Sequence, residues 1–359
     1  MNNVALSGGC VAGRGKRPEQ SAYADAGVDI DAGQDAVRLM GDAVRSTWDD
    51  NVLGKYGAFA GLYSYSEDAH GDVLAVTIDG VGTKVKVAAM CGTYSSVGMD
   101  LVNHCTDDLL VQRARPLLFA DYVASSKLSP EVVAEAVSGM AEACRVVGCS
   151  LIGGETAEMP GVYCDGEVDL AGCMVGVARR SEITDVPPVA PGDVLIGLGS
   201  TGLHTNGYSL ARHLLFGKAG MDVSTEVPEL GCTVGEALLK VHQEYLTVLG
   251  PHLGNPRIHG LAHITGGGLF DNVLRVLPEG CQAHIDKSSW EPLPIFQLLQ
   301  SIGELADNEA YRALNMGIGM VVVVDPACVD ESLKQMGSEA SPAFVIGEIR
   351  AGDTAVQLR

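Results

Sequence analysis

The chain has 359 residues, of which 47% are hydrophobic and 19% are charged, so it can bury the cores of two or three domains. Its formal net charge of -21 argues against nonspecific nucleic-acid binding, which requires a basic face. An acidic chain can still bind phosphates where backbone amides, local cations or Mg²⁺ are available.

Targeting and redox signals point to a soluble, cytoplasmic protein. The 10 cysteines form no CxxC pair and no Cys/His group with zinc-ligand spacing, which favours buried, reduced thiols. No apolar core follows the basic residues near the N-terminus, and no apolar run approaches the ~20 residues that span a bilayer. We expect no membrane partner, and we expect residues 1–20 to form a mobile tail.

The first half of the chain alternates helical and strand patterns. Apolar spacing predicts helices over 33–48, 95–114 and 130–148, the last with Ser129 and Pro130 at its start and Gly148 at its end. Strands are predicted over 72–79, 117–125, 150–154 and 168–180.

Three prolines in TDVPPVAPGD (184–193) indicate the domain boundary, which gives domains over 21–183 and 184–359. The second domain is predicted to have strands over 193–200, 258–265, 282–286 and 316–325, and helices over 207–216, 235–253, 266–277 and 294–302. Strict βαβ alternation is missing, so we expect an α+β (mixed α/β) fold in two domains.

The stretch DGVGTK (79–84) follows an apolar strand. It carries the residue types of a phosphate-binding loop, but its threonine precedes its lysine, unlike a Walker loop. Asp79 could bind a metal ion, Gly80 and Gly82 permit close backbone approach, and Thr83 and Lys84 could contact phosphates. The structural alternative is a β-turn with a solvated lysine.

Two further acidic sites could join Asp79. Asp107 and Asp108 are adjacent in an otherwise apolar helix, where they are unfavourable unless exposed or neutralised. Glu155 and Thr156 directly follow a short strand that ends at Gly154, where the backbone can approach a ligand closely. Three acidic sites suit a polyphosphate held through Mg²⁺, although a solvated helix face would explain the aspartate pair equally well.

In the second half, two loops between a strand and a helix could bind anions. His204 and Asn206 lie in STGLHTNGYS, where His204 could donate to a phosphate or transfer a proton. The alternative is an asparagine N-cap beside a surface histidine. Gly266, Gly267 and Gly268 lie in HITGGG and could form a phosphate cradle from backbone amides.

Taken together, these motifs resemble the phosphoribosylformylglycinamidine cyclo-ligase (aminoimidazole ribonucleotide synthetase) family. The resemblance runs from about residue 21 to the C-terminus. Eight blocks appear in the order of that family: YADAGVDIDAG (23–33), DGVGTK (79–84), GMDLVNHCTDDLLVQ (98–112), LIGGETAEMPG (151–161), GSTGLHTNGYSL (199–210), HITGGG (263–268), RVLP (275–278) and NMGIGM (315–320).

The resemblance implies an ATP-dependent enzyme of de novo purine synthesis with Mg²⁺ as its metal. Formylglycinamidine ribonucleotide would be the small-molecule substrate. ATP would phosphorylate its formamide oxygen, and the amidine nitrogen would then attack to close the ring of aminoimidazole ribonucleotide. The family fold also implies a homodimer, with a β-barrel formed across the interface by the N-terminal domains.

The resemblance also implies roles for residues of this chain that stand in the family's motifs. The resemblance implies metal binding by Asp79, Asp108 and Glu155, and catalytic roles for His204, Asn206 and Lys84. It implies ATP binding by Asp79, Gly80, Gly82, Thr83, Lys84, Asp107, Asp108, Gly154, Glu155, Thr156, Gly266, Gly267 and Gly268.

Three blocks depart from the family pattern. GKYGAF (54–59) stands where GGxGGF is usual, QRARP replaces QGAEP with Arg113 and Arg115, and a PTRIY block is missing near VHQEYLTVL (241–249). The alternatives to the cyclo-ligase are therefore a divergent, non-catalytic ATP-binding paralogue, or another ATP-using member of the superfamily.

Overall fold

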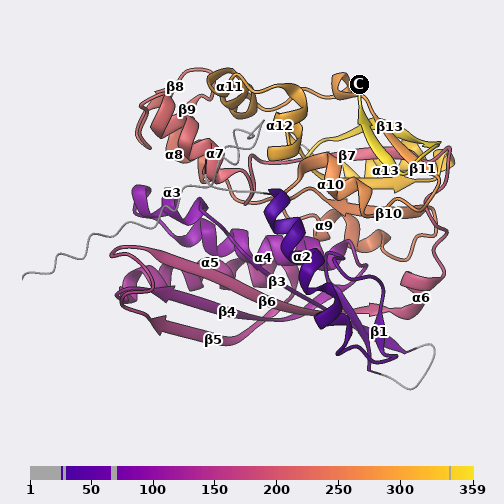
Figure 1. Cartoon of the computed structure of the whole chain (residues 1–359), viewed down its shortest axis with the longest axis horizontal. Helices are drawn as coiled ribbons and strands as arrows, with labels where there is room; N and C mark the ends of the chain where they lie inside the picture. The colour runs from indigo at the N-terminus through magenta and orange to yellow at the C-terminus, as the bar shows by residue number, and fades with distance from the viewer. Residues whose placement is uncertain (1–25, 27–29, 66–70, 339–340) are drawn as a thin grey trace, which may run out of the picture.

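The computed structural model describes residues 26, 30–65, 71–338 and 341–359. The predicted tail (1–20) lies outside these residues, as does most of the YADAGVDIDAG block. Two sheets, one in each half of the chain, are separated by a layer of helices (Figure 1). The mixed α/β architecture in two domains confirms the predicted fold class.

The N-terminal sheet contains six strands. Neighbours are antiparallel except for the parallel pair at one edge, β4 and β5. Their order is β1 (Val52–Leu53), β2 (Gly61–Ser64), β3 (Asp72–Gly80), β6 (Val168–Arg179), β4 (Arg115–Ser125) and β5 (Ser150–Glu158).

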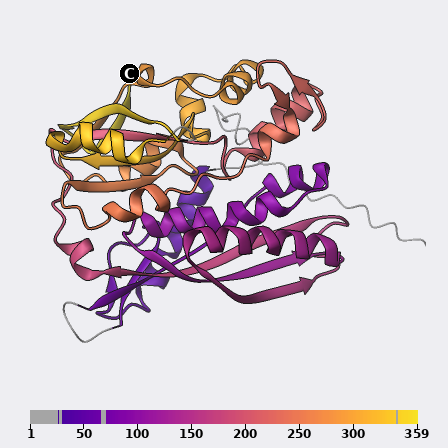
Figure 2. The ribbon, with the colours of Figure 1, turned by 180° about the vertical axis from the view of Figure 1, so that it is seen from behind.

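Helices α4 (Ser95–Leu110) and α5 (Pro130–Val147) cover the face of this sheet that is turned toward the second domain (Figures 1 and 2). Phe119 on β4 and Leu101 on α4 are fully buried between the two layers. Apolar side chains of the strands also remain exposed, with Ile78 at 70% and Ile152 at 62%. The face opposite the helices is therefore left partly apolar and uncovered within this chain.

The C-terminal sheet also has six strands, and β12 (Ile318–Val324), second from one edge, is buried along its whole length. It pairs with β10 (Ile258–His263) on one side and β7 (Val194–Gly199) on the other, and the sheet continues through β13 (Ala343–Ala351), β11 (Cys281–Ile285) and β14 (Ala355–Leu358). A small second sheet pairs β8 (Glu226–Val227) with β9 (Cys232–Thr233).

The remaining helices connect these strands. The α-helices among them are α2 (Ile30–Arg45), α3 (Lys84–Cys91), α6 (Arg180–Thr184), α7 (Tyr208–Arg212), α8 (Val234–Leu238), α9 (Leu246–Leu249), α10 (Gly268–Leu274), α11 (Pro294–Gly303), α12 (Asp307–Ala313) and α13 (Val329–Met336). A π-helix (His213–Lys218) continues α7, and short 3-10 helices cover Gly250–His252, Lys287–Ser289 and Pro326–Cys328. None of the helices described is long and apolar enough to cross a membrane.

The predicted helix over 235–253 is wrong, because residues 239–245 separate α8 from α9. Two carboxylates of α4 accept backbone hydrogen bonds from this segment and so compete with helix formation. Asp100 accepts the backbone N–H of His242 at 2.7 Å, and Asp107 accepts that of Tyr245 at 2.9 Å. These buried bonds satisfy N–H groups that a continuous helix would have used within itself.

Candidate functional site

The DGVGTK stretch forms the turn between β3 and α3, where it meets the second domain. The Thr83 hydroxyl lies 3.1 Å from that of Ser209. A Cβ added at Gly82, whose φ is 54°, would lie 3.8 Å from the carbonyl oxygen of Thr205. The structure therefore places this turn against the STGLHTNGYS loop, so the two motifs share one site.

Asp79 and Asp108 come together at this junction. Nε2 of His104 lies 3.4 Å from the Asp79 carboxylate, whose side chain is 30% exposed. Burial raises the pKa of Asp108 well above its usual value; His104 lowers it, and the nearby Asp79 raises it further. Two carboxylates in this position would be stabilised by a divalent cation, so the residues fit an Mg²⁺ ion.

Lys84 lies away from the exposed part of the site. Its side chain is fully buried, and Nζ lies 2.6 Å from Oδ2 of Asp100. Nζ also donates to the carbonyl oxygens of His204 at 3.1 Å and Lys240 at 2.7 Å. Burial lowers the pKa of Lys84, whereas Asp100 raises it. In this position Lys84 ties α3 and α4 to two loops of the second domain.

Asp107 is also fully buried, and it faces the 239–245 segment. Burial raises its pKa well above the usual value, and the hydrogen bond from the Tyr245 backbone lowers it. Gly154, Glu155 and Thr156 lie on the exposed edge strand β5. Strands β6 and β4 separate β5 from β3. Glu155 is thus roughly 14 Å from Asp79, by the ~4.8 Å spacing of strands.

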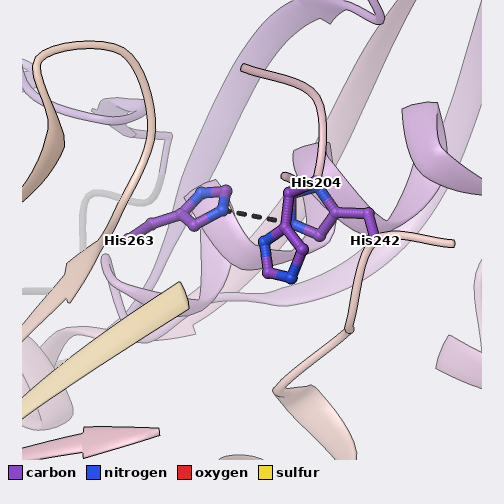
Figure 3. Close-up of side chains that lie close together, drawn as sticks. All are labelled: His204, His242 and His263. Atoms are coloured by element: carbon purple, nitrogen blue, oxygen red, sulfur yellow. Dashed lines mark hydrogen bonds between the residues drawn. The ribbon is translucent and has the colours of Figure 1, made fainter. Parts of the chain in front are cut away.

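Four histidines from distant segments meet behind Asp79. The His204 and His242 rings stack with centroids 4.0 Å apart. Nε2 of His242 lies 3.2 Å from Nε2 of His263 (Figure 3). Nδ1 of His104 lies 2.6 Å from the hydroxyl of Thr205. The three C-terminal histidines are at most 1% exposed, so this cluster is shielded from water.

Burial keeps His204, His242 and His263 neutral. It lowers the pKa of His204 and His242 well below the ordinary value, and that of His263 to about 3. Oδ1 of Asp108 lies 2.8 Å from Nδ1 of His263. When Asp108 is ionised, this contact holds the His263 proton on Nδ1 and leaves a lone pair on Nε2.

The STGLHTNGYS and HITGGG loops lie side by side. A Cβ added at Gly266 would lie 3.5 Å from Oδ1 of Asn206. One added at Gly268, at φ 59°, would lie 1.9 Å from the carbonyl oxygen of Tyr311, so only glycine fits. His204 itself has φ 62°, a strained conformation for a non-glycine residue.

Sequence reasoning did not single out His104, His242 or His263. His263 opens the HITGGG block, and His104 is a lone histidine beside the aspartate pair, so both had a local signal. His242 had none, because it lay within a predicted helix. Its place in the cluster depends on the carboxylates that hold 239–245 open.

The unusual cations of QRARP link structural elements. Arg113 has φ 60°, and it donates to the carbonyl oxygens of Leu253, at 2.6 Å, and Ile258 in the second domain. Arg115 forms a two-pronged pair with Glu182 at 2.8 and 3.2 Å. Both guanidinium groups therefore have partners within the chain.

The GKYGAF loop borders a cavity of about 400 Å³ with a largely apolar lining. Its walls include Trp48, Tyr56 and Leu62. The last residue of the loop, Phe59, is buried and lies beneath the guanidinium of Arg275, 4.5 Å from ring centroid to Cζ. The loop is therefore anchored to the RVLP block at one end.

Comparison with known proteins identifies both domains. Residues 59–178 match the N-terminal domain, and residues 190–359 the C-terminal domain, of AIR synthase related proteins. A phosphoribosylformylglycinamidine cyclo-ligase from Thermoanaerobacter pseudethanolicus is 45% identical over 336 residues, 94% of this chain and 99% of that protein. Another from Syntrophotalea carbinolica is 47% identical over 332 residues, 92% and 95% of the two chains.

The chain belongs to the phosphoribosylformylglycinamidine cyclo-ligase family. This confirms the resemblance drawn from the eight blocks, and with it the assignment as an ATP-dependent cyclo-ligase.

Solved structures agree on the fold of this cyclo-ligase family member. A thiamine-monophosphate kinase from Stenotrophomonas maltophilia K279a has a TM-score of 0.59 at 19% identity, covering 90% of this chain and 94% of that one. T. maritima PurL complexed with AMPPCP has a TM-score of 0.53 at 15% identity, covering 87% and 44%. At such identities the likeness supports the shared architecture alone.

Proposed function

We infer that the chain closes the imidazole ring of aminoimidazole ribonucleotide. ATP transfers its γ-phosphoryl group to the formamide oxygen of formylglycinamidine ribonucleotide, which releases ADP. The amidine nitrogen then attacks the carbon that bears this oxygen, and phosphate leaves. Identity of 45% to a named cyclo-ligase, spread over 94% of the chain, carries this inference.

Asp79 and Asp108 would hold Mg²⁺, which when bound offsets the charge of the ATP phosphates. Gly80, Gly82 and Thr83 line the adjacent turn and would bind the phosphates through backbone and hydroxyl groups. Asp107 and Lys84 would not contact the ligand directly; they would hold the loops of the second domain in place.

Gly154, Glu155 and Thr156 would form a separate part of the nucleotide site. Glu155 is too far from Asp79 to share its ion within one chain. Its edge strand also carries the exposed apolar side chain of Ile152. We therefore assign Glu155 to a second metal or phosphate contact, near the face where a homodimer would form.

The ring-closure side would use the paired loops of the second domain. Asn206 and Gly266 lie close enough to bind one ligand together, with Gly267 and Gly268 continuing the cradle. Because burial keeps His204 neutral, it would donate or accept a hydrogen bond rather than supply a positive charge. Positioning and charge neutralisation would thus account for catalysis.

A homodimer in the cytoplasm fits the remaining features. The N-terminal sheet exposes Val76, Ile78 and Ile152, a set of apolar side chains that a second copy would cover. All the cysteines that the structure describes are free thiols, as a reducing compartment would maintain.

A direct assay tests this function. Purified protein is given formylglycinamidine ribonucleotide, ATP and Mg²⁺, and aminoimidazole ribonucleotide, ADP and phosphate are measured. We expect the three products in equal amounts. Folded protein that binds ATP but forms no aminoimidazole ribonucleotide would favour the non-catalytic paralogue instead.

A further inference from the structure

The histidine cluster has the spacing of a metal-ligand set. Nitrogens of His204, His242 and His263 all lie within 4.8 Å of one another. The Nε2 atoms of His242 and His263 are 3.2 Å apart. Two imidazoles on one tetrahedral zinc ion place their nitrogens about 3.3 Å apart, given Zn–N distances of about 2.0–2.1 Å. Small side-chain rotations would therefore complete the site.

The surroundings of His263 also suit a metal ligand. Its Nδ1 lies 2.8 Å from Oδ1 of Asp108, and when it donates to that carboxylate the lone pair is on Nε2, 3.2 Å from Nε2 of His242. Metal-binding histidines commonly donate their second N–H to a carboxylate, which fixes the tautomer and the ring.

Two polar atoms at the cluster are left without partners among the described residues. Oδ2 of Asp107 is buried and accepts no hydrogen bond, although it lies 3.3 Å from Nε2 of His242. Nδ1 of His204 is also buried and unpartnered. Buried polar atoms rarely remain unsatisfied, and a bound cation would explain why the fold tolerates them here.

We propose that His204, His242 and His263 bind one divalent transition-metal ion of the zinc type, with the Asp107 carboxylate available as a further ligand. Imidazole ligands favour Zn²⁺ and Co²⁺ over Mg²⁺, which prefers oxygen. This site is distinct from the Mg²⁺ site at Asp79. Its ion would fix the 239–245 segment between β10 and the STGLHTNGYS loop.

Without metal, the same histidines would form a hydrogen-bonded chain. The His242 ring would donate to His263 and accept from Thr205, which lies 3.5 Å from Nδ1 of His242. That arrangement satisfies most of the cluster, but it leaves Asp107 Oδ2 and His204 Nδ1 unpartnered. A metal-binding cluster and a purely hydrogen-bonded cluster differ in metal uptake, which can be measured directly.

The test uses the full, tag-free chain after treatment with a chelator. Co²⁺ is added in the presence of excess Mg²⁺, and visible absorption is followed. We expect one equivalent of Co²⁺ to bind with the intense visible bands of a tetrahedral site, Zn²⁺ to displace it, and the melting temperature to rise on binding. Absence of stoichiometric uptake, or displacement by Mg²⁺, would overturn the proposal.

Two variants locate the ion. His242→Gln should weaken Co²⁺ binding by more than about 100-fold, whereas His213→Gln, at an exposed histidine outside the cluster, should leave it unchanged. Equal binding by wild type and a folded His242→Gln variant would show that the ion lies elsewhere. If His242→Gln does not fold, the stoichiometry and spectrum of the wild-type protein still decide the matter.

Discussion

Lys84 and Asp100 form an ion pair with no exposed surface on either side chain, and Nζ lies 2.6 Å from Oδ2. The pair joins α3 to α4, and through the carbonyl oxygens of His204 and Lys240 it reaches two loops of the second domain. A cation in the DGVGTK motif thus acts inside the protein, where a solvated or phosphate-binding lysine was expected.

Lys84→Met should lower the free energy of unfolding by about 3–5 kcal/mol, because it leaves Asp100 buried without its partner. Urea denaturation measures this loss. The control is Lys86→Met, which breaks a half-exposed pair with Glu167 and should cost no more than about 1 kcal/mol. A stable Lys84→Met protein with weakened ATP binding would instead restore the nucleotide-contact role.

Local sequence signals predicted most of the regular elements. The strand predicted over 72–79 is observed as Asp72–Gly80, and the helix over 130–148 as Pro130–Val147. Periodicity, Pro130 and Gly148 are signals carried by neighbouring residues, so these elements could be located without the rest of the fold. The DGVGTK and HTNGYS motifs were also identified as sites from their own residues.

The remaining features depend on contacts between distant segments. The break at 239–245 requires Asp100 and Asp107, which are more than a hundred residues earlier in the chain. The histidine cluster requires that break. The separation of Glu155 from Asp79 follows from strand order, which no local pattern determines.

Asp79→Asn should reduce kcat/KM for ring closure by about 100-fold or more, because one carboxylate of the proposed Mg²⁺ site is neutralised. Stability should change little, since the side chain is 30% exposed. Asp72→Asn, at the exposed opposite end of β3, is the matched control and should retain activity. Turnover like that of the wild type in Asp79→Asn would remove Asp79 from the metal site.

Arg113→Ala should lower the free energy of unfolding by about 3 kcal/mol, because charge-assisted hydrogen bonds to Leu253 and Ile258 of the second domain are lost. Arg113→Gly should cost about 1 kcal/mol less, since glycine adopts φ 60° without strain. Thermal or urea unfolding of both variants checks this order. If the alanine variant proves as stable as wild type, Arg113 does not hold the domains together.

Acidification should weaken the fold through His263. Its folded pKa of about 3 lies below the ordinary 6.5, so below pH 6.5 the unfolded chain binds more protons than the folded one. This contribution to stability is therefore complete above pH 6.5 and declines as the pH falls toward 3. Asp107 and Asp108 have the opposite effect, because their raised pKa values mean that the folded chain binds their protons more readily than the unfolded chain does.

The His263 effect is isolated by comparing wild type with His263→Gln. Urea midpoints at pH 7.5 and pH 5 should differ more for the wild type than for the variant, because glutamine does not titrate. Both proteins retain Asp107 and Asp108. Identical pH dependence in the two proteins would mean that His263 is not held neutral by its surroundings.

Ile78→Asp should convert the proposed homodimer to monomer. Ile78 is 70% exposed on β3, and a charge there would be buried without a partner if two sheets packed together. Light scattering during size-exclusion chromatography measures the mass. Val146→Asp places the same charge at a 61% exposed site on α5, away from the sheet, and should leave the mass unchanged. If the wild-type protein is a monomer, there is no such interface. If the Ile78→Asp variant remains a dimer, the subunit interface lies outside this face of the sheet.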